Sequence, residues 1–178
     1  MARRDTAARR YAEAAFEIGR SEGTLDTWER DLQRLADALA DEELRALVEH
    51  PAVPYAAKAR VVRRVVSDVS PEAANLVLLM VRRGRPRAIA EMTRHFAALV
   101  RRHRGVALAE VRTVLPMEDA QRSAVTERLH ELTGQPIEIN EVVDESLIGG
   151  ITVRIGDRLY DASVRNRLER LRARLTAV

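Results

Sequence analysis

The sequence predicts a mainly helical protein with a small α+β module at its C-terminal end. Up to Gly105, apolar residues recur every three or four positions, which is the spacing of amphipathic helices. After Gly105 the spacing changes to alternation, which is typical of half-buried strands. Hydrophobic residues make up 46% of the chain but aromatic residues only 3%, so Ala, Leu and Val must fill the core. We therefore expect a six-helix bundle over residues 1–105, followed by a β-α-β-β-α domain over residues 106–178.

The first three helices are predicted from apolar stripes and capping residues. The first covers residues 5–20 and carries a stripe of mostly small side chains, namely Ala8, Tyr11, Ala12, Ala15 and Ile18. Small side chains on such a stripe allow another helix to approach closely. A second helix is expected to begin after Thr24, with inward positions Leu25, Trp28, Leu32, Leu35 and Leu39. Asp41 begins a short third helix, which Pro51 and Pro54 end.

Three further helices complete the predicted bundle. The fourth places four valines inward, Val61, Val62, Val65 and Val66. Ser70 followed by Pro71 is a strong start for the fifth helix, because proline is tolerated at the first helical position. This helix is apolar nearly all round over residues 76–81, so it is either buried or shares a face with a partner. The sixth stops at Gly105 and carries Ile89, Met92, Phe96, Leu99 and Val100.

The segment after Gly105 predicts strands around one helix. Residues 109–115 alternate as a strand, and a helix from Glu118 to Gly134 points Val125, Leu129 and Leu132 inward. Two more strands are expected at residues 137–143 and 151–155. Gly149 and Gly150 lie between these strands, where glycine can adopt positive φ and let another backbone come close.

The chain is predicted to end in an amphipathic helix. Gly156 and Asp157 form a tight turn, a short strand follows, and Asp161 can cap the helix. Its apolar seam has heptad spacing and consists of Val164, Leu168, Leu171, Leu175 and Val178. We expect Val164 and Leu168 to cover the sheet, because its apolar face needs cover. The later seam is flanked by Arg170, Arg172 and Arg174, which suits a helical partner with acidic edges.

The residues offer no constellation for catalysis. The chain has no cysteine, which excludes thiolate metal sites and cysteine nucleophiles. No two histidines among His50, His95, His103 and His130 are three or four positions apart, so no helix presents a paired metal site. The glycine pair leads into a strand without a nearby lysine, unlike a phosphate-binding loop. We expect neither an enzyme nor a cofactor or metal site.

The charge pattern leaves a second hypothesis open. The net charge is +3, and positive charge is concentrated in residues 58–104. That stretch could bind nucleic acid, or it could form solvated helix faces or a surface for acidic partners or lipid headgroups. It lacks interleaved aromatic residues, so a basic nucleic-acid-binding protein is the alternative function rather than the main one. No run of about 20 apolar residues could span a membrane, and the basic N-terminus does not resemble a secretory signal.

A long pattern with fixed spacings runs through the C-terminal part of the chain. It consists of Ile137, Ile139, Val143, Asp144, Leu147, Gly149, Gly150, Ile151, Val153, Arg154 and Gly156. Asp161 and residues 163–171 extend it, and residues 8–16 form a matching first helix. The pattern resembles the signature of the delta subunit of bacterial F-type ATP synthases, the counterpart of the mitochondrial oligomycin-sensitivity-conferring protein.

This resemblance implies a non-catalytic stator subunit in the peripheral stalk, which holds the catalytic head still while the rotor turns. It implies one copy per complex, on the cytoplasmic face of the plasma membrane and membrane-associated only through the complex. In the family, the N-terminal helix of an alpha subunit binds between the first and fifth helices. Here that groove corresponds to Tyr11, Ala12, Ala14, Ala15, Leu76, Val77 and Met80. The C-terminal module meets the membrane-anchored b subunit, and the corresponding residues are Leu171, Leu175 and Val178.

Overall fold

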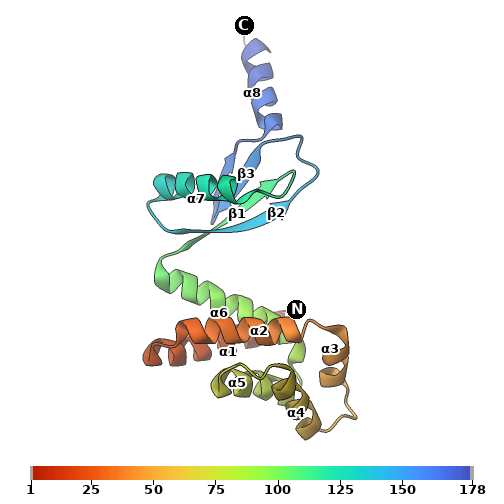
Figure 1. Ribbon diagram of the computed structural model, residues 1–178. Coiled ribbons are helices and arrows are strands. Elements are labelled where there is room, and N and C mark those ends of the chain that lie inside the picture. The colour runs from red at the N-terminus through yellow and green to blue at the C-terminus, as the bar shows by residue number, and fades with distance from the viewer. Residues whose placement is uncertain (1, 177–178) are drawn as a thin grey trace. The chain divides into compact units, whose positions relative to one another are not determined.

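A computed structural model describes residues 2–176, with side chains from Thr6 to Leu175 (Figure 1). The described chain is mainly helical with a small mixed four-stranded sheet. It divides into two compact units, residues 1–100 and residues 101–178. Each unit has a hydrophobic core of its own.

Unit 1 is built from helices joined by short connections. They are α1 (Ala2–Glu22), α2 (Leu25–Ala38), α3 (Glu42–Glu49), α4 (Tyr55–Val65), α5 (Pro71–Arg82), the short 3-10 helix η1 (Pro86–Ala88) and α6 (Ile89–Arg104). Helix α6 ends where the sequence predicts, because Gly105 follows with a φ of +67°. Both Phe16 and Trp28 contact Phe96, with ring centroids 6.5 and 6.3 Å away. Three of the six aromatic side chains of the chain thus form one cluster in the core of unit 1.

The small-residue stripe of α1 packs inside unit 1. Ala8, Ala12 and Ala15 are buried, and the stripe continues to Gly19 rather than to Ile18, which is 45% exposed. A Cβ on Gly19 would lie 3.0 Å from Cδ1 of Trp28, so the absence of a side chain there lets α1 and α2 approach closely. The prediction that Val65 points inward is also wrong. Val65 is the last residue of α4 and is 57% exposed.

Two of the predicted helix starts are capped in a different way from the one expected. Asp41 caps α3 as predicted, because its carboxylate accepts a hydrogen bond from the Leu44 amide at 2.9 Å. Thr24 and Ser70 make no side-chain capping bond at α2 and α5. At α5 the Ser70 amide instead donates to the Asp31 carboxylate of α2 at 2.7 Å. The start of α5 is therefore held by a residue that is distant in sequence.

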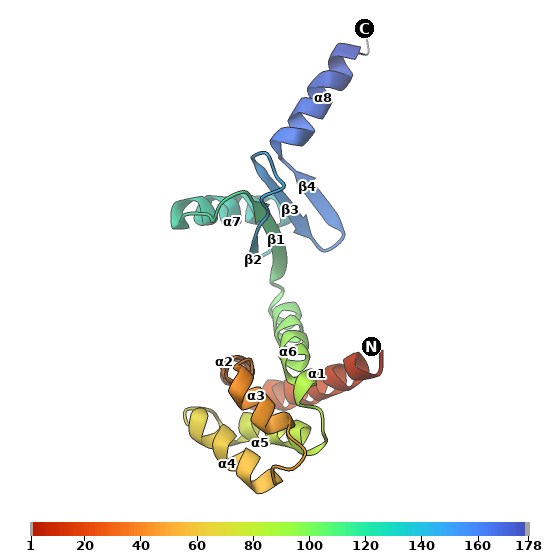
Figure 2. The same ribbon diagram turned by 90° about the vertical axis from the view of Figure 1, so that its right-hand side faces the viewer.

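Unit 2 packs one helix on a four-stranded sheet (Figure 2). Its elements are β1 (Ala107–Thr113), α7 (Asp119–Thr133), β2 (Ile137–Val143), β3 (Ile151–Ile155), β4 (Arg158–Asp161) and α8 (Val164–Thr176). The strand order is β2-β1-β3-β4; β1 and β2 are parallel and the other pairs are antiparallel. The short strand predicted after Gly156 is β4, which pairs with β3 over its whole length and extends the expected β-α-β-β-α order by one strand.

The core of unit 2 lies on one face of the sheet. Ala109, Val111 and Val153 are buried there together with Leu129 of α7. Three positions predicted to be apolar and inward are exposed, because they lie at the ends of their elements or beyond them: Leu115, Leu132 and Val143. Glu141, which lies between the apolar positions of β2, accepts a hydrogen bond from the Met117 amide at 2.5 Å and pairs with Arg122 of α7. This carboxylate therefore ties α7 and its preceding loop to the sheet.

Candidate partner-binding surfaces

The predicted groove residues of α1 and α5 divide into a buried and a surface group. Ala12, Ala15, Val77 and Met80 are at most 1% exposed, because they form the contacts between the helices of unit 1. They cannot touch a partner without displacing this core. Tyr11 and Leu76 are half-buried and Ala14 is exposed. A direct contact with a partner helix can therefore come only from these three members of the set and their neighbours.

A shallow hollow lies beside the surface group on α1. It has a volume of about 490 Å³ and is lined by Thr6, Ala7, Arg10, Tyr11, Ala14 and Arg85. Five of these residues come from α1, and Arg85 follows the end of α5. The structure thus brings Tyr11 and Ala14 together with Arg85, a residue that the sequence patterns did not single out. Leu79, which is 40% exposed on α5, lies within the apolar stretch 76–81 but was not one of the residues predicted to line the groove.

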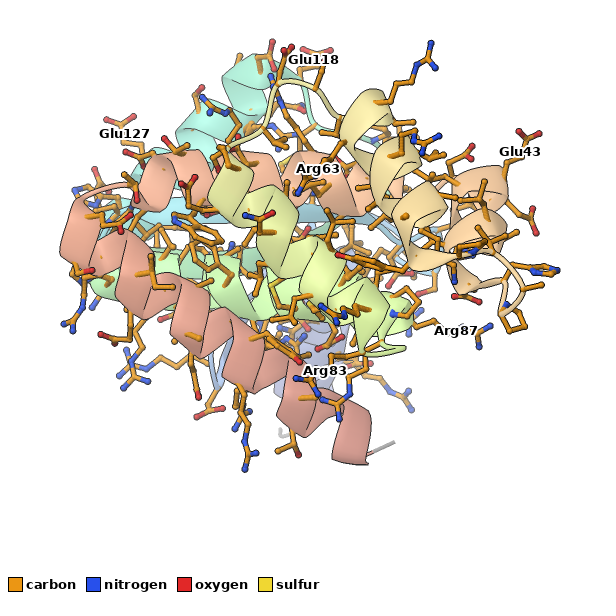
Figure 3. The ribbon with its side chains drawn as sticks, turned by 90° about the horizontal axis from the view of Figure 1, so that it is seen from below. Glu43, Arg63, Arg83, Arg87, Glu118 and Glu127 are labelled. Atoms are coloured by element: carbon orange, nitrogen blue, oxygen red, sulfur yellow. The ribbon has the colours of Figure 1, made fainter. Side chains whose placement is uncertain are left out.

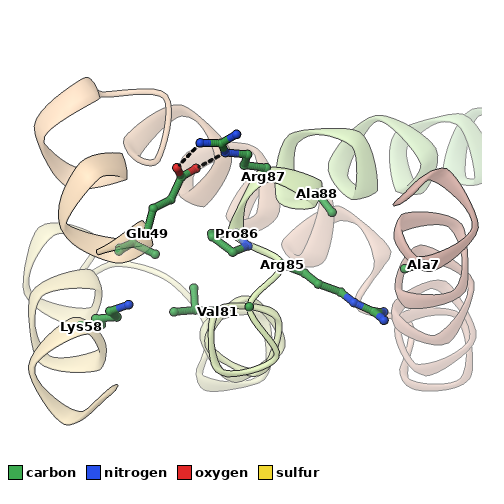
Figure 4. Close-up of a pocket in the computed structure, with 10 residues that line it drawn as sticks. Ala7, Glu49, Lys58, Val81, Arg85, Pro86, Arg87 and Ala88 are labelled. Carbon is green, nitrogen blue, oxygen red and sulfur yellow. Dashed lines mark hydrogen bonds and ion pairs between the residues drawn. The ribbon is translucent and has the colours of Figure 1, made fainter. Parts of the chain in front are cut away.

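A second hollow, of about 470 Å³, lies next to the first (Figure 4). The two share Ala7 and Arg85. The floor of the second is apolar, with Val48, Val81 and Ala88, and Lys58 of α4 extends toward Val81. Glu49 and Arg87 form a bidentate ion pair at its rim, with bonds of 2.8 and 2.7 Å. These hydrogen bonds to Glu49 raise the pKa of the Arg87 guanidinium, because they stabilise its charged form.

The final helix α8 exposes its entire described seam. Val164 is 36% exposed, Leu168 55%, Leu171 54% and Leu175 71%. The prediction that Val164 and Leu168 cover the sheet is therefore wrong, since neither packs against the core of unit 2. Leu171 and Leu175, the residues expected to meet a partner, are free at the surface, and Val178 lies outside the described residues.

The glycine pair joins α8 to the sheet. Gly150 has a φ of +80°, and a Cβ there would lie 2.5 Å from the Ala162 carbonyl oxygen. Both predicted reasons for glycine, positive φ and close approach of another backbone, thus apply at this position. The Val164 amide donates to the Gly149 carbonyl at 2.9 Å. The helix is capped by Ser163, whose hydroxyl accepts from the Asn166 amide at 3.2 Å, and not by Asp161, which accepts from the Ser163 amide.

The remaining signature residues hold unit 2 together. Ile137, Ile139 and Ile151 pack against its core, around Val153. Asp144 accepts hydrogen bonds from the amide and the hydroxyl of Ser146, which lower its pKa and fix the loop after β2. Arg154 pairs with Glu110 directly across β1 and β3 at 2.8 Å. Leu147 and Gly156 lie in the two turns that flank β3. The signature is thus a structural frame that positions the start of α8.

The histidine and acidic side chains form no candidate metal site in the part of the chain that the structure describes. No group of three or more His, Cys, Asp or Glu residues there could hold a metal ion. Histidine side chains have local partners: His50 accepts from the Ala52 amide, His95 lies 3.2 Å from Glu91, and His130 bonds to the Gln135 carbonyl. Among the described residues, no helix is long and apolar enough to cross a membrane.

Several cations of the basic stretch are used within their own units. Arg87 pairs with Glu49, Arg94 with Glu91, and Arg101 with Glu138. Many arginines elsewhere on the helices are exposed, such as Arg83 (Figure 3). Cations that are spread over several helix faces and partly neutralised favour a solvated surface over a nucleic-acid footprint.

Comparison with known proteins covers nearly the whole chain. The family model described as ATP synthase delta (OSCP) subunit matches residues 7–175. The ATP synthase subunit delta of Methylobacillus flagellatus is 37% identical over 96% of this chain and 97% of its own length. That of Moorella thermoacetica is 33% identical over 92% and 93%. Among solved structures, a chain of the Toxoplasma gondii mitochondrial ATP synthase hexamer superposes with a TM-score of 0.71 at 25% identity, covering 96% of this chain and 98% of that one.

Proposed function

The chain belongs to the ATP synthase delta (OSCP) subunit family, and from this we propose that it joins two partners within the peripheral stalk: the N-terminal helix of an alpha subunit and the b subunit. The family role is that of a structural, non-catalytic subunit of the synthase, which couples proton flow to ATP synthesis by holding the catalytic head still. The match over residues 7–175 carries this assignment. The placement of each partner rests on the surfaces described above.

We place the alpha-subunit helix on unit 1, beside Tyr11 and Ala14. The hollow there is open, and its half-buried tyrosine offers an apolar surface to an amphipathic helix. Leu76 of α5 is the third member of the predicted set that reaches the surface. The helices of unit 1 act as one bundle that presents this surface.

We place the b subunit on α8. Its seam of Leu168, Leu171 and Leu175 is exposed, and an uncovered apolar stripe on a helix calls for a partner. Arginines flank the seam, so two copies of this helix would repel each other. A helix with an apolar stripe and acidic edges would cover the seam and pair with the arginines that flank it. Two separate contacts on one chain increase the effective concentration of each partner for the other, so moderate individual affinities give a lasting joint.

The proposed setting is the cytoplasmic face of the plasma membrane, with one copy per complex and no direct insertion into lipid. Co-purification tests the whole proposal. We expect the tagged chain to retain both the alpha and the b subunit from detergent-solubilised synthase. Retention of neither subunit contradicts the proposal, and retention of only one contradicts the placement of the other.

A further inference from the structure

The two hollows of unit 1 are neighbours that share one cation. Arg85 and Ala7 line both the hollow beside Tyr11 and the hollow that contains Lys58. In Figure 4, Arg85 extends toward α1, whereas Lys58 comes from α4. A segment lying in the first hollow therefore has the second within reach of its side chains.

Arg85 is held in place by its backbone. Helix α5 ends in a turn in which Gly84 has a φ of +67° and the Arg85 amide donates to the Met80 carbonyl at 2.9 Å. The Gly84 amide donates to the Val81 carbonyl at 3.0 Å, which completes a Schellman motif. Pro86 follows and restricts the backbone of Arg85 further. The backbone from which the Arg85 side chain extends is thus fixed.

The positive charge of the second hollow is not neutralised from within. Of its four charged residues, Glu49 is engaged by Arg87 in the bidentate pair. No ion pair joins the side chain of Lys58 or Arg85 to another residue in the described part of the chain. The hollow therefore combines an apolar floor with two unpaired cations, one of them half-buried. This arrangement suits a carboxylate on an aliphatic stem.

We propose that the second hollow receives an acidic side chain of the helix that docks beside Tyr11 and Ala14, attracted by the positive charges of Lys58 and Arg85 on its two sides. The inference rests on the proposed function and adds to it the chemistry of the partner. The apolar contact gives the helix its place, and the carboxylate fixes its register and direction. A partner helix without an acid at this position binds more weakly.

The test is a fluorescence titration of the full chain with a labelled peptide of the alpha-subunit N-terminus from the same organism. A second peptide carries Asn and Gln in place of its Asp and Glu residues. The variants are Arg85→Glu, Lys58→Glu and, as a matched control, Arg83→Glu, which changes an exposed cation two residues away that lines neither hollow. Ala14→Arg tests the docking surface itself. Thermal melting establishes that each variant is folded.

We expect Arg85→Glu and Lys58→Glu each to raise the dissociation constant of the acidic peptide about tenfold, and Arg83→Glu to leave it nearly unchanged. The amide peptide should bind the unmodified chain as weakly as the acidic peptide binds Arg85→Glu. Added salt should weaken the acidic peptide more than the amide peptide.

Two results separate this inference from the function on which it rests. If Ala14→Arg abolishes binding but both peptides bind the unmodified chain equally, the acidic contact is wrong and the docking surface stands. If Ala14→Arg binds like the unmodified chain, the docking surface itself is wrong. The comparison of the acidic and the amide peptide uses only the unmodified chain, so it tests the acidic contact even if Lys58→Glu fails to fold.

Discussion

At the scale of single residues, Asp31 is a fully buried carboxylate that the apolar pattern of α2 does not reveal. It accepts hydrogen bonds from the Ser70 amide at 2.7 Å and from Arg30 at 3.0 Å. Burial alone would raise the pKa of Asp31, but the bonds from Ser70 and the charge of Arg30 lower it below its ordinary value. The carboxylate thus joins α2 to the start of α5 in its ionised form.

We expect Asp31→Asn to reduce the free energy of unfolding by about 1–3 kcal/mol at neutral pH, because a charged hydrogen-bond acceptor is lost in the core. A group whose folded pKa is lowered contributes stability above its unfolded pKa, near 3.9, and loses it as pH falls through the folded pKa. The difference between the two chains should therefore shrink below about pH 4. Urea unfolding at several pH values measures it, with the exposed Asp37→Asn as control. A difference that does not depend on pH contradicts this role of the charge.

Gly150 gives a second prediction for a single residue. Gly150→Ala adds a Cβ that meets the Ala162 carbonyl at 2.5 Å in a left-handed backbone. Gly156→Ala is the matched control, since Gly156 has a φ of +56° and nothing within 4 Å of the added carbon. We expect the control to cost about 1–2 kcal/mol from the left-handed conformation alone, and Gly150→Ala to cost clearly more. Equal melting temperatures for the two variants would show that the close approach does not constrain Gly150.

At the scale of elements, α8 has an apolar seam that nothing in the described chain covers beyond Val164. We expect Leu168→Ala and Leu175→Ala to leave the melting temperature nearly unchanged, because each side chain is more than half exposed. Both should weaken co-purification with the b subunit. If Leu168→Ala melts early, its side chain packs internally and is not a partner contact.

Helix α1 offers a neighbouring pair with opposite expectations. Ala15 is 1% exposed, so Ala15→Arg forces a charge into the core and should lower the melting temperature steeply. Ala14 is exposed and lines the hollow, so Ala14→Arg should leave the fold intact and block the alpha-subunit peptide. Circular dichroism melting with peptide titration distinguishes the two. A folded Ala15→Arg variant contradicts the packing of the stripe.

At the scale of the whole molecule, the two units have separate cores of unequal size. We propose that they unfold independently and that unit 2 unfolds first, since it buries fewer large side chains. Trp28 is the only tryptophan and lies in unit 1, so its fluorescence reports on that unit alone. In urea, circular dichroism should show an early phase that is missing from the fluorescence curve. Superimposable curves would mean that the two units unfold as one.

The sequence by itself determined the elements and their order. Local signals were sufficient for this, because a proline after Ser70, a glycine at position 105 or alternation across Val111 acts through the nearest backbone. The close backbone approach at Gly150 was predicted for the same reason. The family signature, which includes Asp144 and Arg154, also belongs to the linear sequence.

The tertiary structure decided which apolar faces are covered and which charges are buried. The spacing of Leu168 and Leu175 shows that α8 has an apolar side, but the same spacing serves a core or a partner. Likewise, nothing near Asp31 in the sequence reveals that the Ser70 amide will meet it. Whether an apolar side chain is covered or a charge is paired depends on residues that are distant along the chain. The positions of those residues are fixed only when the helices pack. Ala12, buried in the core, and Ala14, exposed on the same helix, differ for that reason alone.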